Sequence, residues 1–194
     1  MTAGTDMNVG EASIKLLEAY GVNTVFGIPG VHTLEFCRGL NNSSIQHVQA
    51  RNEQGAGFMA DGYARASGKP GVALLISGPG VTNALTAIGQ AYADSIPMLV
   101  LSADTASHTH GKGWGCLHEV PSLVATTAPL TAFSATAMSA EDVPALFARA
   151  FSVFSSERPR PVHISIPIDV LEQPAGGDWE AIELPQRPAP TAKR

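Results

Sequence analysis

Residues Arg51–Arg65 read RNEQGAGFMADGYAR and follow an extended apolar run at Ile45–Ala50. They have the character of a helix that begins directly after a strand. Glycine destabilises a helix by roughly 1 kcal/mol relative to alanine, so Gly55 and Gly57 indicate that another group approaches the backbone closely. Glu53 lies at the strand-to-helix junction, where open α/β sheets bind their ligands. For an isolated acid at this place, stabilisation by the helix dipole is the favoured explanation, so further motifs must decide.

Strands and helices alternate along the whole chain. The uninterrupted apolar runs Gly71–Ser77 and Pro97–Ala103 are typical of strands buried on both faces, as in a parallel sheet. Further strands are predicted at Asn23–Phe26, Ile45–Ala50, Thr131–Ala135 and Pro161–Pro167, and helices at Val9–Tyr20, Val31–Gly39, Glu53–Ser67, Gly80–Ser95, Glu119–Thr127 and Asp142–Ser155. This alternation predicts a three-layer α/β/α domain with a doubly wound, mostly parallel six-stranded sheet.

Composition sets the domain boundary and excludes several classes of protein. From Glu172 the chain turns to Pro, Gly and scattered charge, so we expect a domain over residues 1–172 and a linker or tail over 173–194. The net charge of −5 offers no basic surface for nucleic acid. Cys37 and Cys116 lack metal-ligand spacing and suit a reducing cytoplasm. Neither a signal peptide nor a membrane-spanning run is found, so we expect a cytoplasmic protein without a membrane partner.

Two further motifs flank Glu53. Phe26–Gly30 (FGIPG) lies upstream, and Ser77–Asn83 (SGPGVTN) lies downstream. Each is also explained as an ordinary turn at a strand end, and the second as an anion site at a helix N-terminus. In this order, and with the EQGA and MADGYAR segments of the central helix, the motifs resemble the pyrimidine-binding domain of thiamine-diphosphate enzymes of the acetolactate synthase and 2-oxo acid decarboxylase group. The resemblance runs through most of Val9–Leu171 and implies the thiamine-diphosphate-binding fold.

The resemblance implies a role for Glu53. In such enzymes one glutamate hydrogen-bonds a ring nitrogen of the aminopyrimidine and favours its imino tautomer, which then removes the proton from the thiazolium carbon. Glu53 occupies that position of the motif. The residues that would hold the pyrimidine half of thiamine diphosphate are Ile28, Pro29, Gly30, Glu53, Ser77, Gly78, Pro79, Gly80 and Asn83.

The loop Ser107–Glu119 contains the second catalytic candidate. Its histidines have irregular spacing, so we expect no metal site there. In acetolactate synthases the matching loop ends in Phe-Gln-Glu, and the Gln faces the reactive end of the cofactor. Here His118 takes that place, which makes it a candidate substrate-facing residue that donates or accepts a proton. The alternative is a solvated loop histidine.

Two departures from the synthase pattern bear on the substrate. Ala132 stands where synthases usually carry Lys, and Leu117 and His118 replace Phe and Gln. A decarboxylase or lyase acting on another 2-oxo acid is therefore as consistent with the sequence as acetolactate synthesis.

The diphosphate half of the expected site has no match. Family enzymes bind the diphosphate and Mg²⁺ through Gly-Asp-Gly and a later Asn in a separate domain, whereas Gly176–Asp178 has no Asn after it. We therefore expect a fragment of a longer enzyme or one subunit of a split enzyme, with Mg²⁺ and diphosphate held by another domain or subunit. A homodimer with sites between chains is implied, and the chain alone should turn nothing over.

Two alternatives use the same residues differently. A non-catalytic module that pairs with a full thiamine-diphosphate enzyme accounts for the missing half. A dinucleotide-binding domain is disfavoured, because Asn83 and Cys116 stand where the third glycine of each glycine loop belongs.

Overall fold

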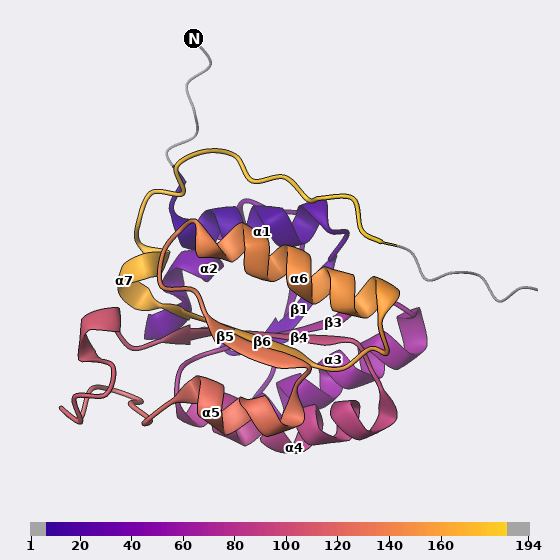
Figure 1. The fold of residues 1–194 in the computed structure, drawn as a ribbon, viewed down its shortest axis with the longest axis horizontal. Coiled ribbons are helices and arrows are strands. Elements are labelled where there is room, and N and C mark those ends of the chain that lie inside the picture. Colours follow the sequence, from indigo (N-terminus) through magenta and orange to yellow (C-terminus); the bar gives the residue numbers. More distant parts are fainter. Residues whose placement is uncertain (1–6, 186–194) are drawn as a thin grey trace, which may run out of the picture.

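The computed structural model describes residues 7–185 (Figure 1). Its centre is a six-stranded sheet in the order β2-β1-β3-β4-β6-β5, and all neighbouring strands are parallel. The strands are β1 (Thr24–Gly27), β2 (Gln46–Gln49), β3 (Gly71–Leu75), β4 (Met98–Asp104), β5 (Phe133–Thr136) and β6 (Val162–Pro167). The first strand, β1, lies inside the sheet, and the later strands are added on both sides of it. This order confirms the predicted doubly wound architecture.

Helices cover both faces of the sheet. One face carries α1 (Val9–Ala19), α2 (Leu34–Asn41), α6 (Asp142–Ser156) and α7 (Ile168–Leu171), and the other carries α3 (Glu53–Ser67), α4 (Pro79–Asp94) and α5 (Leu123–Thr127) (Figure 1). Short 3₁₀ turns lie at η1 (Val31–Thr33), η2 (Ser107–Thr109) and η3 (Ala128–Leu130). Helix α3 has the predicted bounds, whereas α7 was not predicted from the sequence.

The two central strands show why their sequences are apolar throughout. Leu99 and Leu101 of β4 belong to the cluster under α1 and α6, while Met98 and Val100 belong to the cluster under α3 and α4. Because successive side chains of a strand point to opposite faces, a sheet covered on both sides requires apolar residues at every position.

Close packing of α3 on α4 explains one of the two glycines that opened the sequence analysis. A Cβ at Gly57 would lie 2.7 Å from the Cβ of Ala87, so α4 is the group that approaches the backbone there. Gly55 meets nothing within 4 Å in the described part of the chain, so the prediction of a close approach is not met by this chain at that position.

The described part of the predicted tail runs over α1 (Figure 1). Asn8 and Pro174 form an antiparallel bridge, and Trp179 and Leu184 pack against the core beneath. The domain boundary at Glu172 stays a prediction. Within residues 7–185, no helix has the length and apolar character needed to cross a membrane.

Candidate functional site

The two glycine motifs meet around the side chain of Ile76. A Cβ on Gly30 would lie 2.7 Å from Cγ2 of Ile76, and a Cβ on Gly80 would lie 2.6 Å from its Cγ1. Real side chains do not approach this closely, so both positions require glycine. Pairing of β1 with β3, at Gly27 and Leu74, brings the two turns to the same end of the sheet. Sequence reasoning missed Ile76, because an isoleucine after a buried strand carries no distinctive signal.

Glu53 lies at the first position of α3, beside these turns. The side chain of Asn52 caps the helix by accepting a 2.8 Å hydrogen bond from the Gln54 amide. Asn83 donates a 2.9 Å hydrogen bond from Nδ2 to Oε2 of Glu53, and the Cγ of Glu53 lies 3.8 Å from the Cβ position of Gly80. A carboxylate accepts up to about four hydrogen bonds, so half-buried Glu53 retains capacity for an outside donor.

The remaining residues predicted to hold the cofactor form the rim of the same turns. Ile28 is half-buried and packs against the core, while Pro29, Pro79 and Asn83 are exposed. The arrangement is a surface of bare glycine backbone and apolar side chains with one carboxylate at its edge.

His118 touches the other end of the Ser77–Gly80 turn. A Cβ on Gly78 would lie 2.1 Å from the carbonyl oxygen of His118, and Ser77 Oγ donates a long 3.5 Å hydrogen bond to that oxygen. Both Gly78 and His118 have positive φ, 57° and 63° respectively, and for a non-glycine residue this conformation is uncommon. The Ser77–Gly80 turn therefore adjoins Glu53 at Gly80, and it adjoins His118 at Gly78.

A second histidine, which sequence reasoning missed, lies against His118. His32 belongs to η1, and its ring stacks on that of His118 with centroids 5.3 Å apart and planes inclined by 30°. His32 is only 5% exposed. Burial, and secondarily the like charge of His118, lower the pKa of His32. The residue stands two places beyond Gly30, yet the sequence alone does not show that a distant loop folds onto it.

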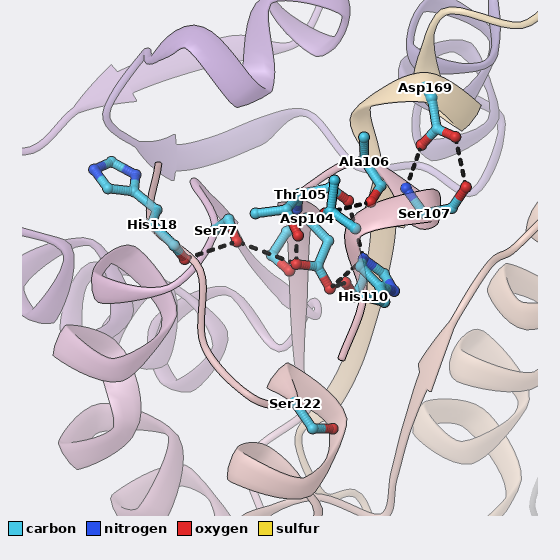
Figure 2. A network of polar contacts seen from close by, with 12 residues as sticks. Ser77, Asp104, Thr105, Ala106, Ser107, His110, His118, Ser122 and Asp169 are labelled. Carbon is cyan, nitrogen blue, oxygen red and sulfur yellow. Dashed lines mark hydrogen bonds and ion pairs between the residues drawn. The ribbon is translucent and has the colours of Figure 1, made fainter. Parts of the chain in front are cut away.

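A buried polar network fixes the loop that carries His118 (Figure 2). Asp104 at the end of β4 accepts hydrogen bonds from Ser77 Oγ (3.2 Å), Ser165 Oγ (3.1 Å) and the Thr105 amide (2.8 Å). His110 Nε2 lies 2.9 Å from the Thr105 carbonyl oxygen and 3.7 Å from Oδ2 of Asp104. The network joins the ends of β3, β4 and β6 to the start of the loop.

The carboxylates of Asp169 and Glu119 also bind this loop, one near its start and one near its end. Asp169 accepts hydrogen bonds from the amide (2.8 Å) and Oγ (2.6 Å) of Ser107 (Figure 2), and Glu119 Oε2 accepts from the Cys116 amide (2.9 Å). His118 is half-buried beside a hollow of about 570 Å³ that Gly113, Cys116 and Glu119 also line. Within the described residues, no group of three or more His, Cys, Asp or Glu side chains is arranged to hold a metal ion.

Comparison with known proteins agrees with this geometry. The family model for the thiamine pyrophosphate enzyme N-terminal TPP binding domain matches residues 7–125. The chain is 66% identical over 175 residues to the "Probable 2-ketoarginine decarboxylase AruI" of Pseudomonas aeruginosa, covering 90% of this chain and 31% of that protein. It is 38% identical to the chloroplastic acetolactate synthase of Arabidopsis thaliana, covering 89% of this chain and 26% of that protein. With the acetolactate synthase large subunit of Lactococcus lactis it shares 39% identity, covering 81% of this chain and 27% of that protein. The chain thus spans less than a third of the length of these relatives.

Proposed function

The chain belongs to the thiamine pyrophosphate enzymes, as an N-terminal TPP-binding domain, and from this premise we propose that it holds the aminopyrimidine half of thiamine diphosphate. The observation that carries the proposal is the position of Glu53, whose carboxylate is tied to Asn83 and adjoins Gly80 at the glycine turns. A flat ring with a hydrogen-bonding edge suits this surface, because the turns at Gly30 and Gly80 pack directly on Ile76 and carry no side chains of their own there. A Cβ at either glycine would overlap Ile76, so neither position accepts a larger residue without a shift.

Each residue at this surface has a definite task in the proposal. Bound thiamine diphosphate supplies the carbon nucleophile and the electron sink for chemistry on a 2-oxo acid. Glu53 shares a proton with a ring nitrogen of the pyrimidine, and Asn83 orients its carboxylate. Gly78 and Ser77 fix the backbone of His118, which donates or accepts a proton at the substrate.

The proposed reaction of the whole enzyme is decarboxylation of a 2-oxo acid. The 66% identity to a protein named as a 2-ketoarginine decarboxylase exceeds the 38–39% identity to the acetolactate synthases. His118 and Ala132, which depart from the synthase pattern, favour the same choice. We therefore propose 2-ketoarginine, a 2-oxo acid with a cationic guanidinium end, as the substrate.

The rest of the site belongs to another domain or subunit. Mg²⁺ and the diphosphate have no candidate ligands in the proposed pyrimidine site, whose polar side chains are Glu53, Ser77 and Asn83. The proposal therefore includes a diphosphate-binding domain, covalently attached or separate, and a homodimer in which the site forms between chains. The matched segments make up only 31% and 26% of two of these relatives, which leaves room in them for such a domain.

The test is CO₂ release by this domain assembled with a diphosphate-binding domain, thiamine diphosphate and Mg²⁺. Loss of a proton-sharing catalytic group typically costs 10²–10⁴-fold in rate, so Glu53→Gln should lower turnover of 2-ketoarginine by about 100-fold or more. Glu172→Gln, at an exposed acid outside the site, is the matched control. Equal turnover by Glu53→Gln and the parent would remove Glu53 from the mechanism, and turnover of pyruvate in preference to 2-ketoarginine would contradict the substrate.

A further inference from the structure

The stacked rings of His32 and His118 come from distant parts of the chain. His32 lies in η1, after β1, and His118 lies in the loop after β4. The ring of His32 is enclosed, whereas His118 borders the hollow beside Cys116 and Glu119. One ring is therefore shut off from solvent and the other lies where a small molecule can reach it.

Each of the two rings has an unsatisfied nitrogen. Nδ1 of His32 and Nδ1 of His118 are both buried and have no hydrogen-bond partner within the described residues. Leaving a buried polar atom unpaired costs about 1–3 kcal/mol, and native structures contain few such atoms. Two of them in one stacked pair point to a hydrogen-bonding group that comes from outside the described chain.

Burial and neighbouring charges together set the pKa of His32. The charged groups that act on His32 are His118 from the loop and Asp104 from the end of β4; the histidine lowers the pKa of His32 and the carboxylate raises it. Burial is the largest influence and also lowers this pKa, while a hydrogen bond to the backbone of Leu117 raises it. Because two positive rings 5.3 Å apart repel each other and burial disfavours a charge on His32, a proton on the pair belongs on the ring of His118.

We propose that His32 and His118 act as one proton-exchanging pair at the substrate end of the site, with His118 in contact with the substrate and His32 as its neutral positioning residue. The location at the substrate end rests on the proposed function; the pairing does not. In the donating direction, an N–H bond of the protonated His118 ring breaks and an O–H bond forms at an anionic oxygen of the 2-oxo acid. The pair then changes from one positive charge to none. Stacking on His32 fixes the plane of the His118 ring.

The first test needs neither cofactor nor substrate. Side-chain NMR titration of the 194-residue chain should show that His118→Asn raises the pKa of His32. The expected change is an increase, because the like charge of His118 is one of the causes that lower the pKa of His32. Asn is chosen because it tolerates the positive φ at position 118, and His118→Gln is a second variant if the first does not fold. The chemical shift of His47 on β2 reports whether the fold is preserved. An unchanged titration of His32 in the folded variants would overturn the pair.

The second test uses the assembled enzyme and its pH–rate profile. His118→Gln should abolish the limb of the kcat profile that this histidine produces. His32→Gln should keep the limb and lower kcat by up to about 10-fold, the scale of one lost ring-stacking contact. His108→Gln, at an exposed loop histidine, is the control. A parent-like rate for folded His32→Gln would overturn the positioning role. Failure of the enzyme to bind thiamine diphosphate would instead count against the proposed function, and the NMR titration would still decide the pairing.

Discussion

Asn83 donates a 2.9 Å hydrogen bond from its side-chain amide to Oε2 of Glu53. The bond joins the first turn of α4 to the first residue of α3, so two of the three sequence motifs meet in one contact. Both residues stand at the carboxyl edge of a parallel sheet, where such folds form their ligand sites.

The first prediction concerns this bond. Asn83→Ala should lower kcat/KM of the assembled enzyme by about 10–100-fold, because Glu53 loses the donor that orients its carboxylate and a small misplacement of a catalytic group costs up to about 100-fold. Stability should change by less than about 0.5 kcal/mol, since Asn83 is exposed. Steady-state kinetics and denaturant unfolding measure the two effects. Thr82→Ala, at the exposed neighbour whose hydroxyl bonds the Pro79 carbonyl, is the control, and an equal loss in both variants would contradict the role of Asn83.

The second prediction concerns the contact between Gly80 and Ile76. Gly80→Ala places a Cβ 2.6 Å from Cγ1 of Ile76, and overpacking of this kind costs about 1–3 kcal/mol. Ile76→Ala, which removes Cγ1, should recover part of the loss in the same chain, and a double-mutant cycle of unfolding free energies would show this. Gly62→Ala in α3 is the matched control, because nothing lies within 4 Å of the added carbon. That substitution should stabilise the helix by about 0.5–1 kcal/mol. Strict additivity of the Gly80 and Ile76 changes would count against the contact.

The third prediction concerns Gly78. Gly78→Ala introduces a Cβ 2.1 Å from the His118 carbonyl oxygen at a backbone φ of 57°, so both the steric contact and the conformation are unfavourable. The loop must move away, and NMR shifts should change at His118 and at its stacking partner His32. Gly113→Ala, at a positive φ with open space around it, isolates the conformational part. Unperturbed His118 and His32 signals in Gly78→Ala would show that this turn does not hold the loop.

The fourth prediction concerns the pH dependence of stability. His163 on β6 is fully buried among hydroxyls, with Ser102 Oγ 2.9 Å from Nε2 and Thr127 Oγ1 2.8 Å from Nδ1. Burial lowers its pKa to about 3. Below the unfolded value of about 6.5, the unfolded chain binds a proton that the folded chain does not. The contribution of neutral His163 to the free energy of unfolding is therefore complete above pH 6.5 and declines as the pH falls toward 3.

The measurement is the free energy of unfolding between pH 7 and pH 4.5. His163 should account for a loss of about 2–3 kcal/mol over this range, at 1.36 kcal/mol per pK unit. His163→Gln lacks the titrating ring, so its stability, although lower at pH 7, should decline less steeply with falling pH. Parallel curves for the variant and the parent would exclude His163 as the source.

Sequence reasoning predicted most of the fold because its signals are local. The apolar run at Gly71–Ser77 and the amphipathic stripe at Asp142–Ser155 reflect periodicities of single elements, and the structure has β3 and α6 at these places. The missed α7 is four residues long and follows β6 directly, so it presents too few positions for a helical period. The described part of the predicted tail reads as a linker by composition, yet Trp179 and Leu184 pack against the core.

For the site, local motifs were sufficient to identify Glu53, the glycine turns and Asn83, and to show their resemblance to a thiamine-diphosphate domain. Only the tertiary structure decided that Ile76 fills the space between Gly30 and Gly80 and that His32 lies under His118. The physical reason is the order of the strands. Parallel pairing of β1 with β3 and of β3 with β4 brings the turns after these strands to one edge, and contacts between residues so far apart in the chain leave no periodic trace in the sequence.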